Sequence, residues 1–534
     1  MTNDEVFILP ISNGVDSSSY IYVQYNENEG SNFINLEQIE KIKNPIVSWN
    51  LAQSFIDQKV EHQLLSSSLI DLETLAKYYF GLPKKDFNKD VPWSLFNLLK
   101  DEFSSEAEVV SIHKKLRGFK QSRIFNEKDL FSLIQKFANS YFRIKKELAG
   151  TSEWERFIKV EVPISTIFIN RSISGITVSK EKIEIALNSI ESEYFRCLSI
   201  LRSKFGYMAA DISDGSIKLH LSKTNPNLLL DQNSDIISFL KIRKHISEHF
   251  ALLLSCLKNQ RTKRILLVLL FDLQDKVHPI FDISGTVTSR ILTISPNLQN
   301  ISKSFRNVIV PDLNKNFLYL DYSCFEPSIM AGLSKDENLI SLCKSEDLYN
   351  EICKKAGYDT QYRKTFKTIF LAFSFGMNET NLIAFIMEIL EIDKLASIHI
   401  YEAVFKNFKR LQEWKEEIWK STIKNGSSES LFGNRRRRKI NLPQLTFDEQ
   451  RWSINQVVQG TASLILKSAI LKIHSKYSSQ IDVLLPMHDA ILLQGTTDFM
   501  EKETENIKKL MQQAFTDFFP TMNVRISIEP FSNK

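Results

Sequence analysis

Short apolar runs alternate with amphipathic stretches over roughly the first 150 residues of the chain. Runs rich in β-branched and aromatic residues occupy residues 6–9, 20–24 and 45–49, and such runs are typical of strands. Apolar positions within residues 69–80 recur instead with helical spacing. The pattern predicts an α/β domain.

The pattern is mostly helical from about residue 178 to residue 276. Stretches of helical spacing that mix polar and apolar residues cover residues 183–205 and 236–257. Residues 225–234 are rich in Asn and Asp and contain Pro226, so they are the best break in this part. We expect a separate helical region here.

Two apolar runs in the last part of the chain each lead to an aspartate. Residues 317–320 form a short β-type run that ends on Asp321. Residues 483–485 and 490–493 have the pattern of a hairpin, with His488 and Asp489 at its turn. The sequence therefore predicts two strands that each deliver one aspartate.

A predicted helix between these strands repeats chemically useful side chains at one spacing. Arg363, Lys367, Leu371 and Phe375 recur every four residues, which is an advance of about 400° on an α-helix. Their side chains should form one slowly drifting stripe along a single face.

These residue types suit a nucleoside triphosphate. Two carboxylates at neighbouring strand ends can hold a pair of Mg²⁺ ions, which prefer oxygen ligands and keep waters and phosphates for their other positions. Arg363 and Lys367 suit a polyphosphate, and Leu371 and Phe375 suit a base. Taken singly, each feature has an ordinary explanation, because an Asp that ends a strand is often a turn residue and an Arg-x-x-x-Lys face is usually solvated.

Composition and charge exclude several classes of protein. The chain has 68 Lys and Arg against 63 Asp and Glu, a formal charge of +5, which is a weak signal for a polyanionic partner. Its longest apolar run, residues 265–271, is far shorter than the roughly 20 residues that cross a bilayer. The acidic N-terminus and five scattered cysteines without a Cys-x-x-Cys pair predict a cytoplasmic protein without a leader sequence or a zinc site.

The segments that carry the candidate functional residues resemble those of family A DNA polymerases, the DNA polymerase I type, in both their order and their sequences. Residues 321–326 (DYSCFE) resemble motif A, residues 363–376 resemble motif B, and residues 487–489 (MHD) resemble motif C. The resemblance is specific over about residues 285–493 and weaker before them.

Segments that flank these motifs agree with the same family. Residues 288–290 and 295–301 resemble the segment that touches the primer-template duplex. Residues 431–436 resemble the family's hairpin, and residues 451–462 resemble the helix that lines the template and the minor groove of the nascent pair.

The resemblance implies an α+β multidomain protein with the right-hand polymerase fold. An antiparallel palm sheet would carry helical fingers and a helical thumb, behind an N-terminal α/β exonuclease-like domain of the RNase H-like type. The implied domains are the exonuclease-like domain (1–170), the thumb (171–280), the palm with motif A (281–345), the fingers with motif B (346–440) and the palm with motif C (441–534). No separate 5′ nuclease domain is expected ahead of them.

The resemblance also implies roles at the catalytic centre. Asp321 and Asp489, with the backbone carbonyl of Tyr322, would bind two Mg²⁺ ions, for which Mn²⁺ can substitute. Lys367 would protonate the pyrophosphate leaving group. Glu326 would be the steric gate against a ribose 2′-hydroxyl. The implied dNTP contacts are Arg363, Lys367, Leu371, Phe375, Glu326 and Tyr322.

Primer-template DNA and dNTPs are the implied partners. The implied DNA contacts are Arg290, Asn297, Gln299, Asn300, Arg451, Asn455, Gln459 and His488. Contacts to phosphates and to minor-groove acceptors are nearly blind to sequence, as a polymerase requires. We expect a monomer that makes no contact with a membrane.

Four positions depart from the family pattern. Leu371 stands where an aromatic residue is usual, and Phe375 stands where Tyr is usual. The lost hydroxyl would leave Glu326 supported by packing alone. Ala490 replaces a Glu, and Tyr349 replaces a His. No metal ligand and no triphosphate cation is lost, so an active enzyme is expected.

The N-terminal domain lacks the carboxylates that proofreading requires. Pro10 and Ser12 stand where an Asp-x-Glu pair is expected, and Ser54 stands where a further Asp is expected. No third carboxylate is evident near Asn139. Because proofreading metals need several acidic ligands at once, we expect a structural platform.

Residues 435–439 (RRRRK) form a run of five cations. Such a run can be a solvated hairpin or a localisation patch as readily as a nucleic-acid contact. Its place in the polymerase-like hairpin favours phosphate binding. His113, His245 and His474 lack partners at metal spacing and receive no role.

The function that the sequence indicates is a template-directed, DNA-dependent DNA polymerase without proofreading. A non-catalytic DNA-binding scaffold derived from a polymerase stays open, as does a specialised enzyme of repair, lesion bypass or a mobile element. Glu326 and the segment at residues 297–300 speak against a single-subunit RNA polymerase.

Overall fold

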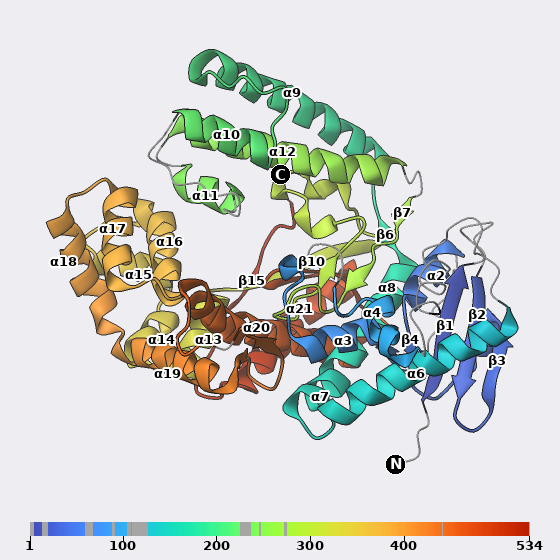
Figure 1. The fold of residues 1–534 in the computed structure, drawn as a ribbon. Helices are drawn as coiled ribbons and strands as arrows, with labels where there is room; N and C mark the ends of the chain where they lie inside the picture. The colour runs from blue at the N-terminus through green and yellow to red at the C-terminus, as the bar shows by residue number, and fades with distance from the viewer. Residues whose placement is uncertain are drawn as a thin grey trace.

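A computed structural model shows helical groups arranged around a small central sheet (Figure 1). The structure describes residues 5–12, 20–58, 68–87, 91–103, 108, 126–224, 236–244, 247–271, 275–440 and 442–532. The predicted break at residues 225–234, His113 and His245 lie outside the described residues. In Figure 1 the central sheet has the N-terminal sheet on one side and helices α14 to α18 on the other, while α9 to α12 lie above it.

The N-terminal region, defined here as β1 to α6, contains a five-stranded sheet of order β3-β2-β1-β4-β5. Strands β1 to β3 are antiparallel, and β4 and β5 continue the sheet in parallel. Helix α6 packs on this sheet, where Phe137 and Tyr141 contact Phe7. The strands are β1 (Val6–Ser12), β2 (Tyr20–Asn26), β3 (Gly30–Ile34), β4 (Ile46–Ser48) and β5 (Leu69–Asp71).

The helix expected over residues 69–80 is wrong at its start. Leu69–Asp71 form β5, because their backbone pairs in parallel with β4. Helix α3 (Leu72–Phe80) begins only after Asp71, whose carboxylate accepts a hydrogen bond from the Thr74 backbone N–H at 2.9 Å. No loop separates the strand from the helix, so apolar periodicity alone does not show where one ends and the other begins.

The predicted helical region consists of four helices among its described residues. The long helices α9 (Lys180–Phe205) and α12 (Glu248–Phe271) pack against each other, and α10 (Asp214–Thr224) and α11 (Ile236–Arg243) lie beside them (Figure 1). The pattern over residues 236–257 therefore covers two helices, since α11 ends at Arg243 and α12 starts at Glu248.

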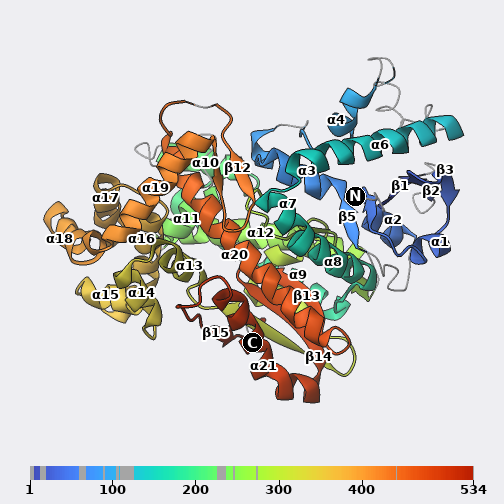
Figure 2. The same ribbon diagram turned by 90° about the horizontal axis from the view of Figure 1, so that it is seen from below.

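The central sheet is antiparallel and has the order β13-β14-β10-β15. It confirms the predicted strand and the predicted hairpin. Helix α20 (Phe447–Tyr477) packs on α21 (Thr497–Thr516), and both contribute to the core beneath the sheet (Figure 2). The strands are β13 (Asp482–Met487), β14 (Ala490–Thr496), β10 (Lys315–Tyr322) and β15 (Ile526–Ile528).

Helices between β10 and α20 extend the same core to one side. Phe366, Phe370, Phe373 and Phe405 are buried there, so these phenylalanines serve the core. The helices are α13 (Phe325–Ser334), α14 (Glu337–Lys344), α15 (Leu348–Lys355), α16 (Arg363–Ser374), α17 (Glu379–Leu390), α18 (Lys394–Val404) and α19 (Lys409–Asn425).

Shorter elements join these groups. The helices are α1 (Leu36–Glu40), α2 (Leu51–Asp57), α4 (Leu95–Leu99), α6 (Glu127–Leu148), α7 (Ser152–Arg156), the π-helix η3 (Phe157–Glu161) and α8 (Val162–Ser174). The strands are β6 (Ile176–Thr177), β7 (Lys276–Val277), β8 (Phe281–Asp282), β9 (Leu292–Thr293), β11 (Ser427–Glu429) and β12 (Arg435–Arg437). Among the described residues, no helix combines the length and apolar character needed to span a bilayer.

Candidate active site

The sheet brings the two predicted aspartates together. Strand β10 pairs with β14 so that Asp321 lies opposite Ala490, the residue after Asp489. The Tyr322 backbone N–H also donates to the Asp489 carbonyl at 3.2 Å. Asp489 lies in the tight turn between β13 and β14, where His488 adopts a left-handed φ of 58°. Two neighbouring strand ends therefore each deliver one carboxylate, as predicted.

The Asp321–Asp489 pair is short of positive charge. Desolvation, followed by repulsion from Asp489 and Glu529, raises the pKa of Asp321 to about 6, although Lys367 and Lys303 oppose this shift. Desolvation also raises the pKa of Asp489, against the attraction of Arg290. A divalent cation would relieve this repulsion, and carboxylate oxygens are ligands that Mg²⁺ prefers.

The donor set fits Mg²⁺ only if other oxygens complete it. Over the described ranges, no group of three or more His, Cys, Asp or Glu could hold a metal ion. Mg²⁺ usually takes one or two carboxylates and completes its coordination with waters and substrate phosphates. The pair therefore suits a metal that arrives together with a phosphate substrate.

Tyr322 contributes to the site only through its backbone. Its side chain is 2% exposed and stacks on Phe325 with ring centroids 4.2 Å apart. The hydroxyl donates to the Met511 carbonyl at 2.7 Å, inside the core. The dNTP contact predicted for Tyr322 can therefore come only from its backbone, because its side chain is buried.

Helix α16 presents the predicted cations. The Arg363 Nε donates to Asp347 at 2.7 Å. The Arg363 guanidinium and the Lys367 Nζ each lie 5.4 Å from the centre of the Tyr349 ring. Lys367 attracts both Asp321 and Asp489 electrostatically, so the cationic face of the helix acts on the aspartates.

The end of the predicted stripe lies outside the helix. Helix α16 ends at Ser374, and Phe375 is its C-cap, whose N–H donates to the Leu371 carbonyl at 3.0 Å. Leu371 is half-buried, and Phe375 packs against the main core. The four residues still follow one another along the chain, but only Arg363, Lys367 and Leu371 are helical.

Glu326 has polar partners, so the expectation that packing alone supports it is wrong. Its carboxylate accepts a hydrogen bond from the Arg290 Nη2 at 2.9 Å and also hydrogen-bonds Gln459. Desolvation and the charge of Asp489 nevertheless raise its pKa. The same Arg290 nitrogen lies 3.9 Å from Asp489. Arg290 thus joins the predicted sugar gate to one of the two predicted metal-binding carboxylates.

A pocket of about 140 Å³ collects most of the predicted DNA-contacting residues. His488 is exposed in it, and desolvation by its surroundings, together with Arg290, lowers the pKa of its imidazole. The predicted site residues that line it are Arg290, Asn297, Gln299, Asn300, His488 and Asp489.

Gln299 has a structural task in this pocket. Its side-chain amide nitrogen donates to the carbonyls of Ile291 at 3.1 Å and Pro486 at 2.6 Å, and its oxygen accepts from the Thr293 N–H. These bonds attach the segment at residues 297–300 to β13. Asn297 accepts from the Thr293 hydroxyl at 3.4 Å, whereas Asn300 is exposed.

Helix α20 carries the remaining predicted DNA contacts. Arg451, Asn455 and Gln459 recur every four residues, so they follow one face over about 12 Å. Gln459 reaches Glu326. The Arg451 side chain is 70% exposed and pairs with Asp448 at 2.7 Å. The face therefore runs from Glu326 to a solvated cation.

The basic run at residues 435–439 follows the turn of the β11–β12 hairpin, and its side chains contact other parts of the protein. Arg436 and Arg438 are 9% and 7% exposed, so the expected phosphate contact is wrong for both. Arg436 lies over the Trp452 ring, and Arg438 pairs with Glu449 at 2.7 Å. Arg437 donates to the Tyr79 carbonyl at 3.1 Å. These contacts dock the hairpin on α20 and on the N-terminal region.

The proofreading positions hold no acidic cluster. Pro10 and Ser12 lie in β1. Ser54 in α2 is buried, donates to the Leu51 carbonyl at 2.8 Å and accepts from the Tyr22 hydroxyl at 3.2 Å. Asn139 is an exposed residue of α6. A buried pair of hydroxyls thus lies where the resemblance predicts a metal-binding carboxylate.

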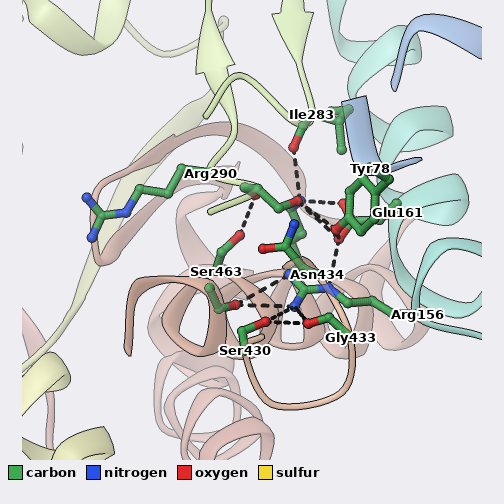
Figure 3. A network of polar contacts seen from close by, with 12 residues as sticks. Tyr78, Arg156, Glu161, Ile283, Arg290, Ser430, Gly433, Asn434 and Ser463 are labelled. Atoms are coloured by element: carbon green, nitrogen blue, oxygen red, sulfur yellow. Dashed lines mark hydrogen bonds and ion pairs between the residues drawn. The ribbon is translucent and has the colours of Figure 1, made fainter. Parts of the chain in front are cut away.

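Sequence reasoning missed a buried ionic network that joins α7 and η3 to α20 (Figure 3). Glu161 is fully buried and pairs with Lys467 and, at 3.2 Å, with Arg156. Desolvation raises the pKa of Glu161, but the two cations outweigh it and leave that pKa below its usual range. The available signal was a single charge within each of two apolar stretches, residues 160–164 and 462–471.

Comparisons with known proteins agree with this geometry. The sequence profile described as DNA polymerase family A matches residues 216–532. The thermostable DNA polymerase I of Thermus thermophilus is 27% identical over 257 residues, which are 45% of this chain and 30% of that protein. The DNA polymerase I of Borreliella burgdorferi is 24% identical over 407 residues, or 70% of this chain and 43% of that protein.

A solved structure shares the fold along almost the whole chain. It is the POL domain of Pol1 from M. smegmatis in complex with DNA primer-template and dNTP. The TM-score is 0.73 at 17% identity, and the match covers 98% of this chain and 94% of that one. This chain spans less than half the length of the two curated relatives. Because the profile matches more than half of the chain, the protein belongs to DNA polymerase family A.

Proposed function

We propose that this protein is a template-directed, DNA-dependent DNA polymerase that uses two divalent metal ions. The observation that carries the proposal is the placement of Asp321 and Asp489 on neighbouring strand ends, within the electrostatic reach of Lys367. That arrangement would be of no use to a protein that only grips duplex DNA, because like charges at the centre weaken binding to phosphates.

Asp321, Asp489 and the Tyr322 backbone carbonyl would hold the metals, Mg²⁺ or in its place Mn²⁺. Such ions activate the attacking hydroxyl and stabilise the leaving oxygen. Arg363 and Lys367 would bind the triphosphate of a dNTP, and Lys367 would give a proton to the pyrophosphate that leaves. Leu371 and Phe375 would provide the apolar contact to the base.

Primer-template DNA would lie along the pocket and the exposed face of α20. That M. smegmatis Pol1 was solved with primer-template and dNTP supports this assignment. In this proposal residues 171–280 act as thumb, residues 346–440 as fingers, and residues 281–345 and 441–534 as palm. Residues 1–170 form a degenerate exonuclease-like domain. The DNA contacts would be Arg290, Asn297, Gln299, Asn300, Arg451, Asn455, Gln459 and His488.

A primer-extension assay separates this proposal from the non-catalytic scaffold. The purified protein is incubated with a labelled primer-template and dNTPs, with Mg²⁺ or with EDTA, and duplex binding is measured alongside. We expect extension only with Mg²⁺. Tight duplex binding without extension in either Mg²⁺ or Mn²⁺ would favour the scaffold.

Glu326 should determine sugar selection. Its side chain is 17% exposed and lies against Arg290, so it fills the space beside the sugar whatever residue 375 is. Glu326→Ala should lower the preference for dCTP over CTP at least about tenfold, and Phe375→Tyr should raise it or leave it unchanged. The measurement is the ratio of kcat/KM for the two nucleotides opposite template dG.

The exposed Glu337 of α14 provides a matched control, since Glu337→Ala removes the same charge away from the site. If the ratio of kcat/KM for dCTP and CTP is the same in Glu326→Ala, Glu337→Ala and the unchanged protein, Glu326 is not the sugar gate.

Proofreading should be absent, because Pro10, Ser12 and Ser54 replace the carboxylates that bind metals in the exonuclease. A labelled primer with a mismatched 3′ end, incubated with Mg²⁺ and no dNTPs, should keep its full length. Shortening that persists in an Asp489→Asn preparation would show that this region retains a nuclease site.

A further inference from the structure

Helix α3 carries one side chain out of the N-terminal region and into the palm. Tyr78 is 2% exposed, and its hydroxyl bonds the Glu161 carboxylate and lies 2.8 Å from the Ser289 Oγ (Figure 3). Ser289 directly precedes Arg290, the residue that joins Glu326 to Asp489. A hydroxyl of the degenerate region thus lies one residue away from a side chain of the proposed polymerase site.

Ser289 is held in a conformation that needs support. Its φ is 59°, in the left-handed region that residues other than glycine seldom adopt, and it is fully buried. Lys467 Nζ donates to its Oγ at 2.7 Å, and Ser463 Oγ donates to its carbonyl. Such a conformation persists only when its surroundings fix it, and Tyr78 is one of these fixed partners.

Arg290 follows Ser289 in the same turn, and its side chain leaves that turn toward Glu326. The Arg290 backbone is fixed in the same turn, since its N–H donates to the Thr286 Oγ1 and its carbonyl accepts from the Gly285 N–H, both at 3.1 Å. Figure 3 shows the Arg290 guanidinium directed away from Tyr78 and Glu161. It ends 2.9 Å from Glu326. A shift of the backbone at Ser289 would therefore change the position of the Arg290 guanidinium relative to Glu326.

Neighbouring residues on α3 make the attachment firm. Lys77 pairs at 2.7 Å with Asp282, a residue of β8, the strand that precedes the Ser289–Arg290 turn. Gly81, the C-cap of α3, lies so close to the hairpin that an added Cβ would be 2.6 Å from the Arg435 carbonyl oxygen. The end of α3 is thus clamped between the Arg290 turn and the basic hairpin.

We propose that Tyr78 is a positioning residue that acts through Ser289 to set Arg290 against Glu326. The degenerate N-terminal region would then be a working part of the polymerase site, which controls sugar selection. This inference rests on the proposed function, because its readout is nucleotide incorporation.

The test compares two adjacent tyrosines of α3. Tyr78→Phe removes the buried hydroxyl and keeps the ring, whereas Tyr79→Phe removes a hydroxyl that donates to Glu147 at the exposed surface at 2.7 Å. The ratio of kcat/KM for dCTP and CTP opposite dG should fall at least about threefold in Tyr78→Phe and stay unchanged in Tyr79→Phe. Ser289→Ala, which removes the partner hydroxyl, should reproduce the effect of Tyr78→Phe.

A second comparison asks whether the effect passes through Arg290. In an Arg290→Ala background, Tyr78→Phe should change the ratio no further, because the side chain that it positions is gone. Assays run well below the melting temperature of every variant exclude unfolding as the cause.

Equal ratios in Tyr78→Phe and Tyr79→Phe would overturn the inference, as would an undiminished effect of Tyr78→Phe in the Arg290→Ala background. If the unchanged protein fails to extend a primer, the proposed function itself is wrong, and that result appears before any variant is compared.

Discussion

Replacing Asp489 with asparagine should reduce primer extension by at least about 10³-fold, since metal-ion catalysis supplies several kcal/mol and each 1.36 kcal/mol is a factor of ten. Asparagine keeps the shape of the side chain but cannot neutralise a cation. Duplex affinity should change little, because it comes mainly from Lys and Arg on phosphates. Single-turnover extension and a binding titration measure the two effects separately.

Asp498→Asn is the matched control, because Asp498 is an exposed aspartate in the first turn of α21, the helix that follows β14. It should extend primers at the rate of the unchanged protein. If Asp489→Asn keeps more than about a tenth of that rate, less than about 1.4 kcal/mol depends on the carboxylate and the two-metal assignment is wrong.

The raised pKa of Asp321 adds an independent readout without activity. Its folded pKa of about 6 lies above the usual value of 3.8, so the folded state binds the proton more tightly. Stability should fall as pH rises from about 4 to about 6 and stay lower above that range. At pH 7.5 without metal, Asp321→Asn should therefore raise the free energy of unfolding by on the order of 1 kcal/mol, after allowance for screening by water. The variant should accordingly melt at a higher temperature. Mg²⁺ should stabilise the unchanged protein and not the variant.

Replacing Glu161 with glutamine should destabilise the fold by about 3–5 kcal/mol, because it leaves Lys467 and Arg156 buried without a counter-charge. Burial already lowers the pKa of Lys467 to about 8, so its charge depends on this partner. The measurement is the urea midpoint of the transition that unfolds α20 and the central sheet, followed by fluorescence.

The matched control lies just before this residue in the chain. Glu155 pairs with Lys159 one turn away, and both side chains are about half exposed, so Glu155→Gln should cost at most about 1 kcal/mol. Adding Lys467→Met to Glu161→Gln should restore part of the loss, since it removes an unpaired buried charge. Equal midpoints for Glu155→Gln and Glu161→Gln would show that the network does not stabilise this part of the fold.

The sequence revealed those parts of the site that depend on local pattern. The run before Asp321 and the hairpin around Asp489 are short apolar strands that end at polar residues. In the helix that starts at Arg363, the candidate side chains recur every four residues. Each of these patterns is visible in a short stretch of sequence. The start of α3 was missed because β5 is only three residues long and its last residue, Asp71, is also the N-cap of α3, so no loop separates the strand from the helix.

Partnerships between distant residues could not be predicted in the same way. Arg290 and Glu326 are 36 positions apart, and Glu161 and Lys467 are 306 apart, so no local spacing relates them. The run at residues 435–439 misled for the same reason, because its charge is evident in the sequence but its internal partners are not. Tyr78 is one of several aromatic residues in α3 until the fold places it against Ser289.

Incorporation opposite each of the four template bases tests the central claim most directly. Four primer-templates that differ only in the first unpaired template base are each incubated with Mg²⁺ and one dNTP at a time. The account predicts that the primer grows by one nucleotide only, or far faster, with the complementary dNTP on each template. Absence of incorporation on all four templates, or addition of the same nucleotide whatever the template base, would contradict it.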